Sequence, residues 1–317
     1  MPIAKPNTLN SGYLIMNQHI LLTGATGMLG KDLIQSLLKR GDQVSILSRK
    51  PQQISGVKFF LWDVENQKID VACLQGVDSI IHLAGENIST EKWTEKRKKE
   101  IIDSRVQSAQ LLFKAIKENK NKVKDFLSAA AVGIYGNRGE EILSEESKAG
   151  NDFLAESCIQ WEAAADEMKA LGLRVLKIRT GVVLSKDSGA LPAMATPIRF
   201  FAGAPLGTGK QWMPWIHHAD MNQVYLHLLD NKSLSGTYNA TAPFPVTNST
   251  ITKALAKKIH RPVWPFKVPK QAMKLILGEM SAIVLNSNHT TAQKLLDTGF
   301  IFKFSHLDEA LSDIYGS

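Results

Sequence analysis

The stretch HILLTGATGMLGK, residues 19–31, decides the fold of this 317-residue chain. Residues 20–23 form a short apolar run that is typical of a fully buried parallel strand, and the run stops at Gly24. Behind the glycines, apolar residues recur at helical spacing, namely Leu29, Leu33, Ile34, Leu37 and Leu38. The stretch therefore predicts a strand, a glycine turn and a helix in immediate succession.

The three glycines of this turn, Gly24, Gly27 and Gly30, each have a physical use. Gly24 permits a tight turn, Gly27 lets the backbone approach a pyrophosphate, and Gly30 lets the helix lie close to the strand. Phosphates would lie at the helix N-terminus, where unpaired amides and the positive end of the helix dipole attract an anion. The spacing is G-x-x-G-x-x-G rather than G-x-G-x-x-G, and the alternative is a glycine-rich turn that binds nothing. Because the strand and helix that the mechanism requires flank the turn, we expect a dinucleotide here.

A second predicted strand, residues 43–48, ends in Ser48, Arg49 and Lys50. In sheets of this kind, an acidic residue about 20 residues beyond the glycine turn binds the ribose 2′-hydroxyl of NAD, whereas a basic residue accommodates the 2′-phosphate of NADP. Arg49 offers a planar fork for a phosphate, and Ser48 offers a hydroxyl beside it. The pattern favours NADP; the alternative is an exposed arginine at a strand end. Asp63, after the third predicted strand, either accepts a hydrogen bond from the adenine amino group or caps a turn.

Strands and helices alternate repeatedly as far as residue 178. The further elements that we expect here are strands at 58–62, 78–83, 123–131 and 173–178, a pair of helices over 93–118, and one helix over 152–171. This alternation predicts an α/β chain with a doubly wound parallel sheet and right-handed crossovers.

The composition of the chain changes after residue 187, because glycine, proline and aromatic residues are frequent in residues 192–214. We expect this region to line a substrate cleft above the carboxyl edge of the sheet, together with Trp212, Trp215, His217, His218 and Asp220. The predicted organisation is a loose leader over 1–17, a coenzyme-binding domain over 18–187 to which part of 212–240 returns, and a smaller C-terminal α/β substrate lobe over 188–317.

Composition excludes several classes of protein. The two cysteines, Cys73 and Cys158, provide neither a disulfide framework nor a metal-ligand spacing, and no apolar run approaches the roughly 20 residues needed to span a bilayer. The formal charge is +8, but acidic residues are interleaved between Lys92 and Lys124, where much of the excess lies, and no nucleic-acid motif accompanies it. We therefore expect a cytoplasmic protein with no metal, no nucleic acid and no membrane as partner.

Several motifs in order resemble the extended short-chain dehydrogenase/reductase superfamily: TGATGMLG, Ser48-Arg49, HLAGENI at 82–88, Tyr135-Gly136, Arg179-Thr-Gly181 and WIHHAD at 215–220. More narrowly, LAGENI, Trp161-Glu162-Ala-Ala-Ala, LGTGKQWMPWIHHAD at 206–220 and the terminal TGFIFKF resemble its atypical branch called epimerase family protein. That branch ends in a small domain of unknown function, and some members carry a cell-division-inhibitor label. The resemblance spans roughly residues 18–315 and implies a Rossmann-like fold.

The resemblance also implies a coenzyme site. NADP would be contacted at its phosphates by Gly24, Thr26, Gly27, Met28 and Leu29, at its 2′-phosphate by Ser48 and Arg49, and on its ribose side by Leu83, Ala84 and Gly85. Glu100 and Arg105 would complete the pocket.

The usual catalytic residues of the superfamily are replaced in this chain. Members that transfer hydride use a tyrosine as acid/base, a lysine four residues later that lowers the tyrosine pKa, and a serine or threonine at the end of the fifth strand. Here Phe153, Ser157 and Ala130 stand at the matching positions. A phenyl ring cannot donate or accept a proton, so either other residues carry the chemistry or hydride transfer has been lost while coenzyme binding is kept.

Replacement candidates are Tyr135 and Glu156, then Asp152, Cys158 and His217. Each has a structural alternative: Tyr135 is a packed aromatic, Glu156 lies about 100° around the helix from the lost lysine, Cys158 is a small buried apolar residue, and His217 is a satisfied structural histidine. Asp220 is expected to cap the helix that it begins.

Two functions remain open from the sequence. The first is an NADP-binding, epimerase-like protein, an oxidoreductase or isomerase that acts on an unknown small molecule. The second is a catalytically silent NADP-bound sensor or scaffold that contacts a protein partner, for example in cell division. A homodimer is compatible with both.

Overall fold

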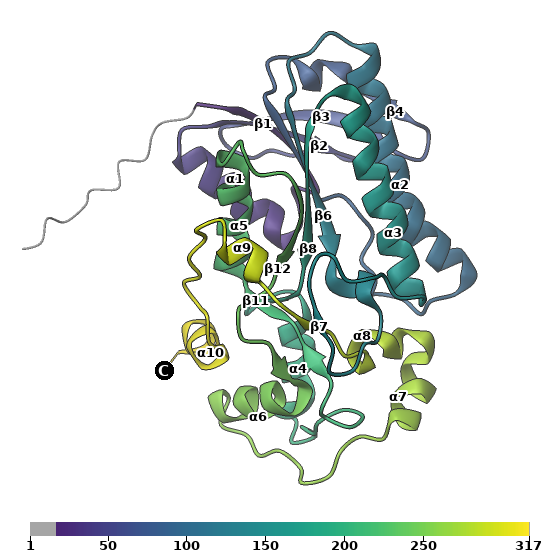
Figure 1. Ribbon diagram of the computed structural model, residues 1–317, viewed down its shortest axis with the longest axis vertical. Coiled ribbons are helices and arrows are strands. Elements are labelled where there is room, and N and C mark those ends of the chain that lie inside the picture. The colour runs from purple at the N-terminus through teal and green to yellow at the C-terminus, as the bar shows by residue number, and fades with distance from the viewer. Residues whose placement is uncertain (1–16, 317) are drawn as a thin grey trace, which may run out of the picture.

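An eight-stranded sheet runs through the centre of the computed structural model, which describes residues 17–316 (Figure 1). The strand order is β12-β8-β6-β5-β1-β2-β3-β4. The bounds are β1 (His19–Thr23), β2 (Gln43–Ser48), β3 (Val57–Asp63), β4 (Lys68–Ile69), β5 (Ser79–His82), β6 (Asp125–Ala131), β8 (Arg174–Thr180) and β12 (Gly236–Ala240). Residues 1–16, most of the predicted leader, lie outside the described residues.

Every neighbouring pair in this sheet is parallel except β3 and β4. The chain builds outward from β1 through β2 and β3, then returns to the other side of β1 and continues through β5, β6, β8 and β12. The predicted doubly wound α/β sheet is therefore confirmed. The order of the strands reverses between β1 and β5, and open sheets of this type bind ligands at the carboxyl ends of the strands beside such a switch point.

Helices cover both faces of the sheet (Figure 1). On one face, α1 (Met28–Lys39) and α5 (His218–Asp230) share a core with alternate residues of β1, among them Ile20 and Leu22. On the other face, α2 (Glu95–Glu118) and α3 (Phe153–Asp166) pack in the core that contains Leu21. This alternation follows from the two-residue period of a strand that is buried on both sides.

The expected pair of helices over 93–118 is wrong, because α2 is one continuous helix of 24 residues. Thr94 caps its N-terminus by accepting a hydrogen bond from the backbone N–H of Arg97, and neither glycine nor proline interrupts the segment that follows. Ile101, Leu112 and Ile116 are buried along one side, so the apolar pattern belongs to a single face.

The C-terminal lobe has a core of its own, which contains Leu191, Trp215, Ile251 and Leu311. The elements of this lobe, and of the segments that join it to the sheet, are short: β7 (Ile142–Leu143), β9 (Val182–Leu184), α4 (Ala190–Arg199), β10 (Trp212–Met213), β11 (Trp215–His217), β13 (Val246–Thr247), α6 (Asn248–Lys258), α7 (Lys270–Leu277), α8 (Ala282–Leu285), β14 (His289–Thr290), α9 (Gln293–Leu296) and α10 (Leu307–Tyr315). Along the whole described chain there are also short 3₁₀ helices, namely η1 (Val71–Leu74), η2 (Val132–Tyr135), η3 (Glu167–Leu171) and η4 (Gly278–Ser281).

The tail of the chain returns from this lobe to the sheet. Leu295, Phe300 and Phe302 are buried in the same core as α1 and α5. The domain boundary predicted at 187/188 remains a prediction. Residues from both sides of it, such as Leu176 and Tyr225, lie in the core that contains α1 and α5. Over the described residues, no helix has the length and apolar character needed to cross a bilayer.

Candidate functional site

The glycine turn after β1 has the geometry that its three glycines predict. Gly24 has φ +68°, and a Cβ there would lie 2.8 Å from the carbonyl of Leu83. A Cβ on Gly30 would lie 2.5 Å from the Gly24 oxygen, so only glycine lets α1 approach the strand this closely. A Cβ on Gly27 would meet only the Gly24 oxygen, at 3.3 Å. The space above Gly27 is therefore otherwise open.

The N-terminus of α1 opens on this space without a protein partner for its amides. Gly27 is the N-cap residue, and no side chain caps the helix there. The first N–H groups of a helix lack intrahelical acceptors, and together with the helix dipole they attract anions. The predicted phosphate contacts thus lie together in one turn, namely Gly24, Thr26, Gly27, Met28 and Leu29. This arrangement fits a diphosphate.

A buried hydrogen-bond chain that the sequence reasoning missed holds the glycine turn against the end of β5. The Thr23 hydroxyl oxygen accepts from the N–H groups of Leu83 and Ala84, at 3.1 Å each, and lies 2.9 Å from Nδ1 of His82. Burial lowers the pKa of His82 to about 4, so the ring is neutral. Because Thr23 already accepts twice, its hydroxyl donates to Nδ1, and Nε2–H donates to Ser108 at 3.1 Å. The only sequence signal was a polar residue at the end of each of two apolar strands.

Ser48 and Arg49 follow at the carboxyl end of β2. The Arg49 side chain is 76% exposed, and its Nη1 lies 3.3 Å from Oε1 of Glu86, which also pairs with Arg97 at 3.3 Å. An exposed ion pair of this kind contributes little free energy, so the guanidinium is available to another anion. Asp63 caps a turn by accepting hydrogen bonds from the backbone and side-chain N–H groups of Asn66, and these bonds lower the pKa of the carboxyl group.

Arg105 lies against Gly85, where an added Cβ would be 3.1 Å from the guanidinium carbon, and it lines a cavity. It is 9% exposed, donates to the carbonyls of Ile101 (2.8 Å) and Glu86 (2.9 Å), and burial lowers its pKa. Its guanidinium carbon is 4.8 Å from the Trp161 ring. The Glu100 side chain instead pairs with Lys96 and Arg97 on α2.

The cavity has a volume of about 380 Å³ and lies at the carboxyl ends of β6 and β8. Ala130, Phe153 and Ser157 all line it, so the structure brings together the three residues that the resemblance matches to the catalytic groups of the superfamily. Arg105 is the only charged lining residue among those described, and burial raises the pKa of the Cys158 thiol to about 12. No lining side chain therefore exchanges a proton near neutral pH. Downstream residues that the sequence reasoning did not place here also line the cavity: Asn286, Asn288, Ala282 and Ile283.

Tyr135 is fully buried in a polar network outside the set of lining residues. Its hydroxyl donates to Oδ1 of Asn239 at 2.7 Å and accepts from Nη1 of Arg179 at 2.9 Å. Arg179 in turn donates to both carboxylate oxygens of Glu162, at 2.7 and 3.0 Å. Burial raises the pKa of Tyr135, although the Arg179 charge opposes this. These contacts are those of a packed structural tyrosine, which was the alternative to a catalytic role.

The other replacement candidates also have structural partners. Glu156 is exposed on α3 and accepts from Gln160 at 3.3 Å. Asp152 caps α3 by accepting from the N–H of Ala155 at 2.9 Å.

The expected cap at Asp220 is wrong, because α5 begins at His218 and Asp220 lies inside its first turn. The cap is His217, whose Nδ1 accepts from the N–H of Ala219; burial lowers the pKa of His217 to about 4. Asp220 instead accepts from the N–H groups of Lys303 and Phe304, at 2.8 and 2.9 Å. These two bonds hold residues 303 and 304 of the returning tail against α5. No local sequence pattern predicts this partner.

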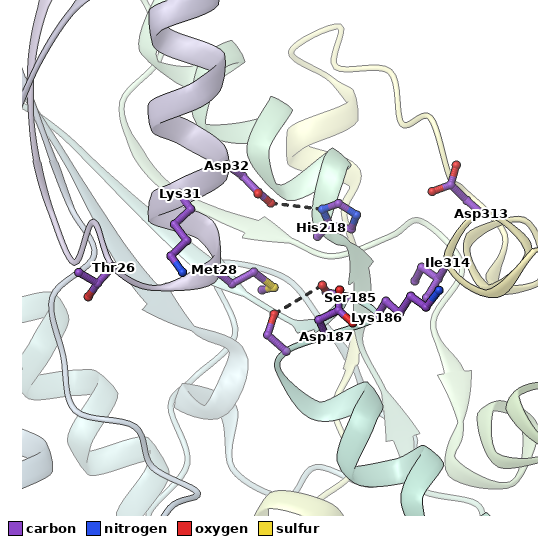
Figure 2. Close-up of a pocket in the computed structure, with 11 residues that line it drawn as sticks. Thr26, Met28, Lys31, Asp32, Ser185, Lys186, Asp187, His218, Asp313 and Ile314 are labelled. Carbon is purple, nitrogen blue, oxygen red and sulfur yellow. Dashed lines mark hydrogen bonds and ion pairs between the residues drawn. The ribbon is translucent and has the colours of Figure 1, made fainter. Parts of the chain in front are cut away.

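The region expected to line a single cleft is divided by the fold. Residues 190–199 form α4, Trp215 is fully buried in the core of the lobe, and Trp212 lines the 380 Å³ cavity. His218 faces a different cavity of about 660 Å³ beside the glycine turn (Figure 2), where its Nδ1 lies 3.2 Å from Asp32. Lys31 and Met28 border this cavity from α1, and the loop after β9 closes the opposite side.

Comparison with known proteins agrees with this geometry over almost the whole chain. Residues 20–241 match the model of the NAD dependent epimerase/dehydratase family, and residues 268–314 match a domain of unknown function, DUF1731. The chain is 36% identical over 299 residues to "Epimerase family protein YfhF" of Bacillus subtilis, covering 93% of this chain and 97% of that protein. It is also 36% identical over 297 residues to "Epimerase family protein SAR0825" of Staphylococcus aureus, covering 93% and 98%.

Among the solved structures with a similar fold are two at 30% and 33% identity. The human epimerase family protein SDR39U1 (isoform 2), solved with NADPH, is 30% identical with a TM-score of 0.83, covering 94% of this chain and 99% of that one. A nucleoside-diphosphate sugar epimerase from Corynebacterium glutamicum is 33% identical with a TM-score of 0.78, covering 95% of this chain and 59% of that one.

Proposed function

The chain belongs to the NAD dependent epimerase/dehydratase family, and from this membership we propose that its coenzyme is NADP(H) and that it acts on a small molecule as an epimerase-like oxidoreductase. The family and the fold support the more general assignment, namely an epimerase-like protein of the short-chain dehydrogenase/reductase type that binds a nicotinamide coenzyme. Arg49 is the observation that carries the choice of NADP. It stands exposed at the carboxyl end of β2, where NAD-selective sheets have a carboxylate.

The chain's own groups have separate tasks in this proposal. The amides of Met28 and Leu29 at the start of α1 hold the diphosphate, and Ser48 and Arg49 hold the 2′-phosphate. The ribose and nicotinamide side is bordered by Leu83, Ala84, Gly85 and Arg105. Glu100 contributes least to binding the coenzyme, because its carboxylate is already paired with two cations. When bound, the coenzyme supplies hydride exchange at its nicotinamide ring. The human relative that was solved with NADPH supports the same assignment.

The substrate end of the site would orient a molecule without acting as an acid or base. The walls of the 380 Å³ cavity are mostly apolar, and the Arg105 guanidinium has N–H groups beyond the two that bind backbone carbonyls. Any proton that the reaction requires would come from solvent or from the substrate itself, because no lining side chain titrates near neutral pH.

A second candidate function is a catalytically silent NADP-bound sensor or scaffold. In its favour, Phe153, Ser157 and Ala130, which the resemblance matches to the three catalytic positions, all line the cavity. The alternative retains the coenzyme site and assigns no turnover to the cavity.

The test has two stages. Titration with NADPH and with NADH, followed by nicotinamide fluorescence, should give saturable binding of both and tighter binding of NADPH; no affinity for either at millimolar concentration would refute both functions. Coenzyme oxidation is then measured across a panel of carbonyl compounds and nucleotide sugars. Steady turnover of any member eliminates the silent alternative, whereas binding without turnover across the panel favours it.

A further inference from the structure

Four exposed aromatic side chains form what we call the aromatic patch: Phe200, Phe201, Trp264 and Phe266, which are 79%, 57%, 48% and 60% exposed. They come from two segments, the turn after α4 and the proline-rich connector between α6 and α7. The Trp264 indole donates to the carbonyl of Phe201 at 2.6 Å, and its backbone N–H donates to Gly203 at 2.8 Å. The rings of Trp264 and Phe266 have centroids 4.9 Å apart. The patch is thus a defined assembly of two segments.

The charge around the aromatic patch is entirely of one sign along the sequence. Residues 188–219 and 231–278 contain ten lysines and arginines and not one aspartate or glutamate. All of these residues are described by the structure, and among the ten cations only Lys232 forms an ion pair. Arg199, Arg261 and Lys267 border the patch directly, and the Arg261 guanidinium lies 5.0 Å from the Phe201 ring.

Acidic side chains near this lobe belong to other elements. They include Asp308, Glu309 and Asp313 on α10, which packs on α6, and Glu279 of η4, which pairs with Lys98. Asp187 lies in the loop before α4, and Asp152 lines a cavity with Lys270 and Lys274 of α7. Figure 1 shows the connector between α6 and α7 crossing the lower end of the molecule, with α10 higher up at the side. The cations of the connector therefore face solvent without local neutralisation.

We propose that the aromatic patch docks this protein onto the surface of an anionic phospholipid membrane. Tryptophan and phenylalanine partition into the boundary between headgroups and acyl chains, and nearby lysines and arginines are attracted to anionic lipids. The absence of acidic residues removes the repulsion that would oppose such contact. Docking on a surface needs no spanning segment, so the expectation of no membrane partner, which came from the lack of a spanning run, does not apply to it.

A nucleic acid is a less suitable occupant for this surface. Proteins that bind single strands use a positively charged groove in which bases stack on separated aromatic rings. Here Trp264 and Phe266 contact each other, and none of the four aromatic residues lines the cavities described above. The patch projects from two turns, which suits a flat and deformable partner.

Sedimentation of the full-length protein with vesicles tests the proposal. Vesicles of phosphatidylcholine with about 30 mol% phosphatidylglycerol should bind at least about tenfold more tightly than vesicles of phosphatidylcholine alone, and binding should weaken as salt is added. Trp264 emission should shift to the blue on binding, and the shift should disappear in Trp264→Phe.

Two double variants separate the apolar from the electrostatic contribution. Phe200→Ser with Phe266→Ser should weaken binding at least about tenfold. Arg199→Glu with Lys267→Glu should weaken it at least about 25-fold, because each cation near an anionic surface contributes about fivefold. The matched controls are Ile301→Ser, at a side chain that is 86% exposed elsewhere, and the double variant of Lys114→Glu on α2 with Lys120→Glu, an exposed residue just after that helix. Each control should change binding less than about threefold.

Three results would overturn the proposal. One is equal binding to anionic and neutral vesicles, and another is equal loss in the patch variants and their controls. The third is salt-sensitive binding of a single-stranded oligonucleotide with no binding to vesicles, which would assign the patch to nucleic acid. Since all substituted side chains are exposed, unchanged melting temperatures will show that the variants are folded.

Discussion

The carboxyl ends of β1 and β2 differ from those of β6 and β8 in how their polar groups are used. At β1 and β2, the first amides of α1 have no side-chain cap and Arg49 is exposed in a single long ion pair. At β6 and β8, Tyr135 and Arg179 are buried and bonded to one another. Groups without strong internal partners can bind a ligand, whereas groups satisfied inside the protein stabilise the fold. The comparison agrees with the proposal of a coenzyme site at β1 and β2 beside a cavity whose described lining side chains do not titrate near neutral pH.

The largest effect is expected when Arg179 is replaced by methionine. Removing one member of a buried ion pair leaves Glu162 with only Lys177, at 3.4 Å, and should lower the free energy of unfolding by about 3 to 5 kcal/mol. Urea denaturation measures this. Arg49→Met is the matched control and should change stability by less than about 0.5 kcal/mol. A loss below about 1 kcal/mol in Arg179→Met would contradict the structural role of the network.

Gly27→Val should next remove coenzyme binding while keeping the fold. The added carbons project into the open space above the N-terminus of α1 and block the amides there, so affinity for NADPH should fall by about 100-fold or more. Isothermal titration measures the affinity, and the melting temperature should stay within about 2 °C. Gly27→Ala should have a smaller effect. Unchanged affinity in both variants would move the diphosphate away from this turn.

Tyr135→Phe distinguishes a structural tyrosine from a catalytic one. Losing the hydroxyl leaves Oδ1 of Asn239 without its donor, and should lower the free energy of unfolding by about 1 to 2 kcal/mol. Affinity for NADPH should be unchanged. If a substrate is found, turnover should also persist in the folded variant; complete loss of turnover without loss of stability would make Tyr135 catalytic.

Arg49→Ala should weaken the binding of one coenzyme only. Loss of the guanidinium should weaken NADPH about tenfold and leave NADH unchanged, because only the 2′-phosphate differs between the two coenzymes. Paired titrations with both coenzymes provide the measurement and its internal control. Equal weakening of both would place Arg49 on a shared part of the coenzyme, and a wild-type preference for NADH would overturn its proposed role.

Local pattern was enough for most of the fold. The apolar run of β1, the glycines behind it and the helical spacing of α1 are short-range features, so their structure follows from backbone sterics and periodicity within a dozen residues. The same holds for the positions of Phe153 and Ser157 on α3, four residues apart and on one face. The continuity of α2 could also have been predicted from the sequence, since Thr94 caps the segment and neither glycine nor proline interrupts it. Its apolar pattern was instead interpreted as two helices.

The sequence by itself determined the doubly wound sheet and the glycine turn between β1 and α1, because each depends on neighbours along the chain. Only the tertiary structure decided what the isolated polar residues do. Asp220 binds amides 83 and 84 residues away, Tyr135 meets Asn239 across 104 residues, and Asn286 joins a cavity wall with Ala130. Such partners are selected by burial, since a polar group taken out of water must find whichever donor or acceptor the packed fold brings near.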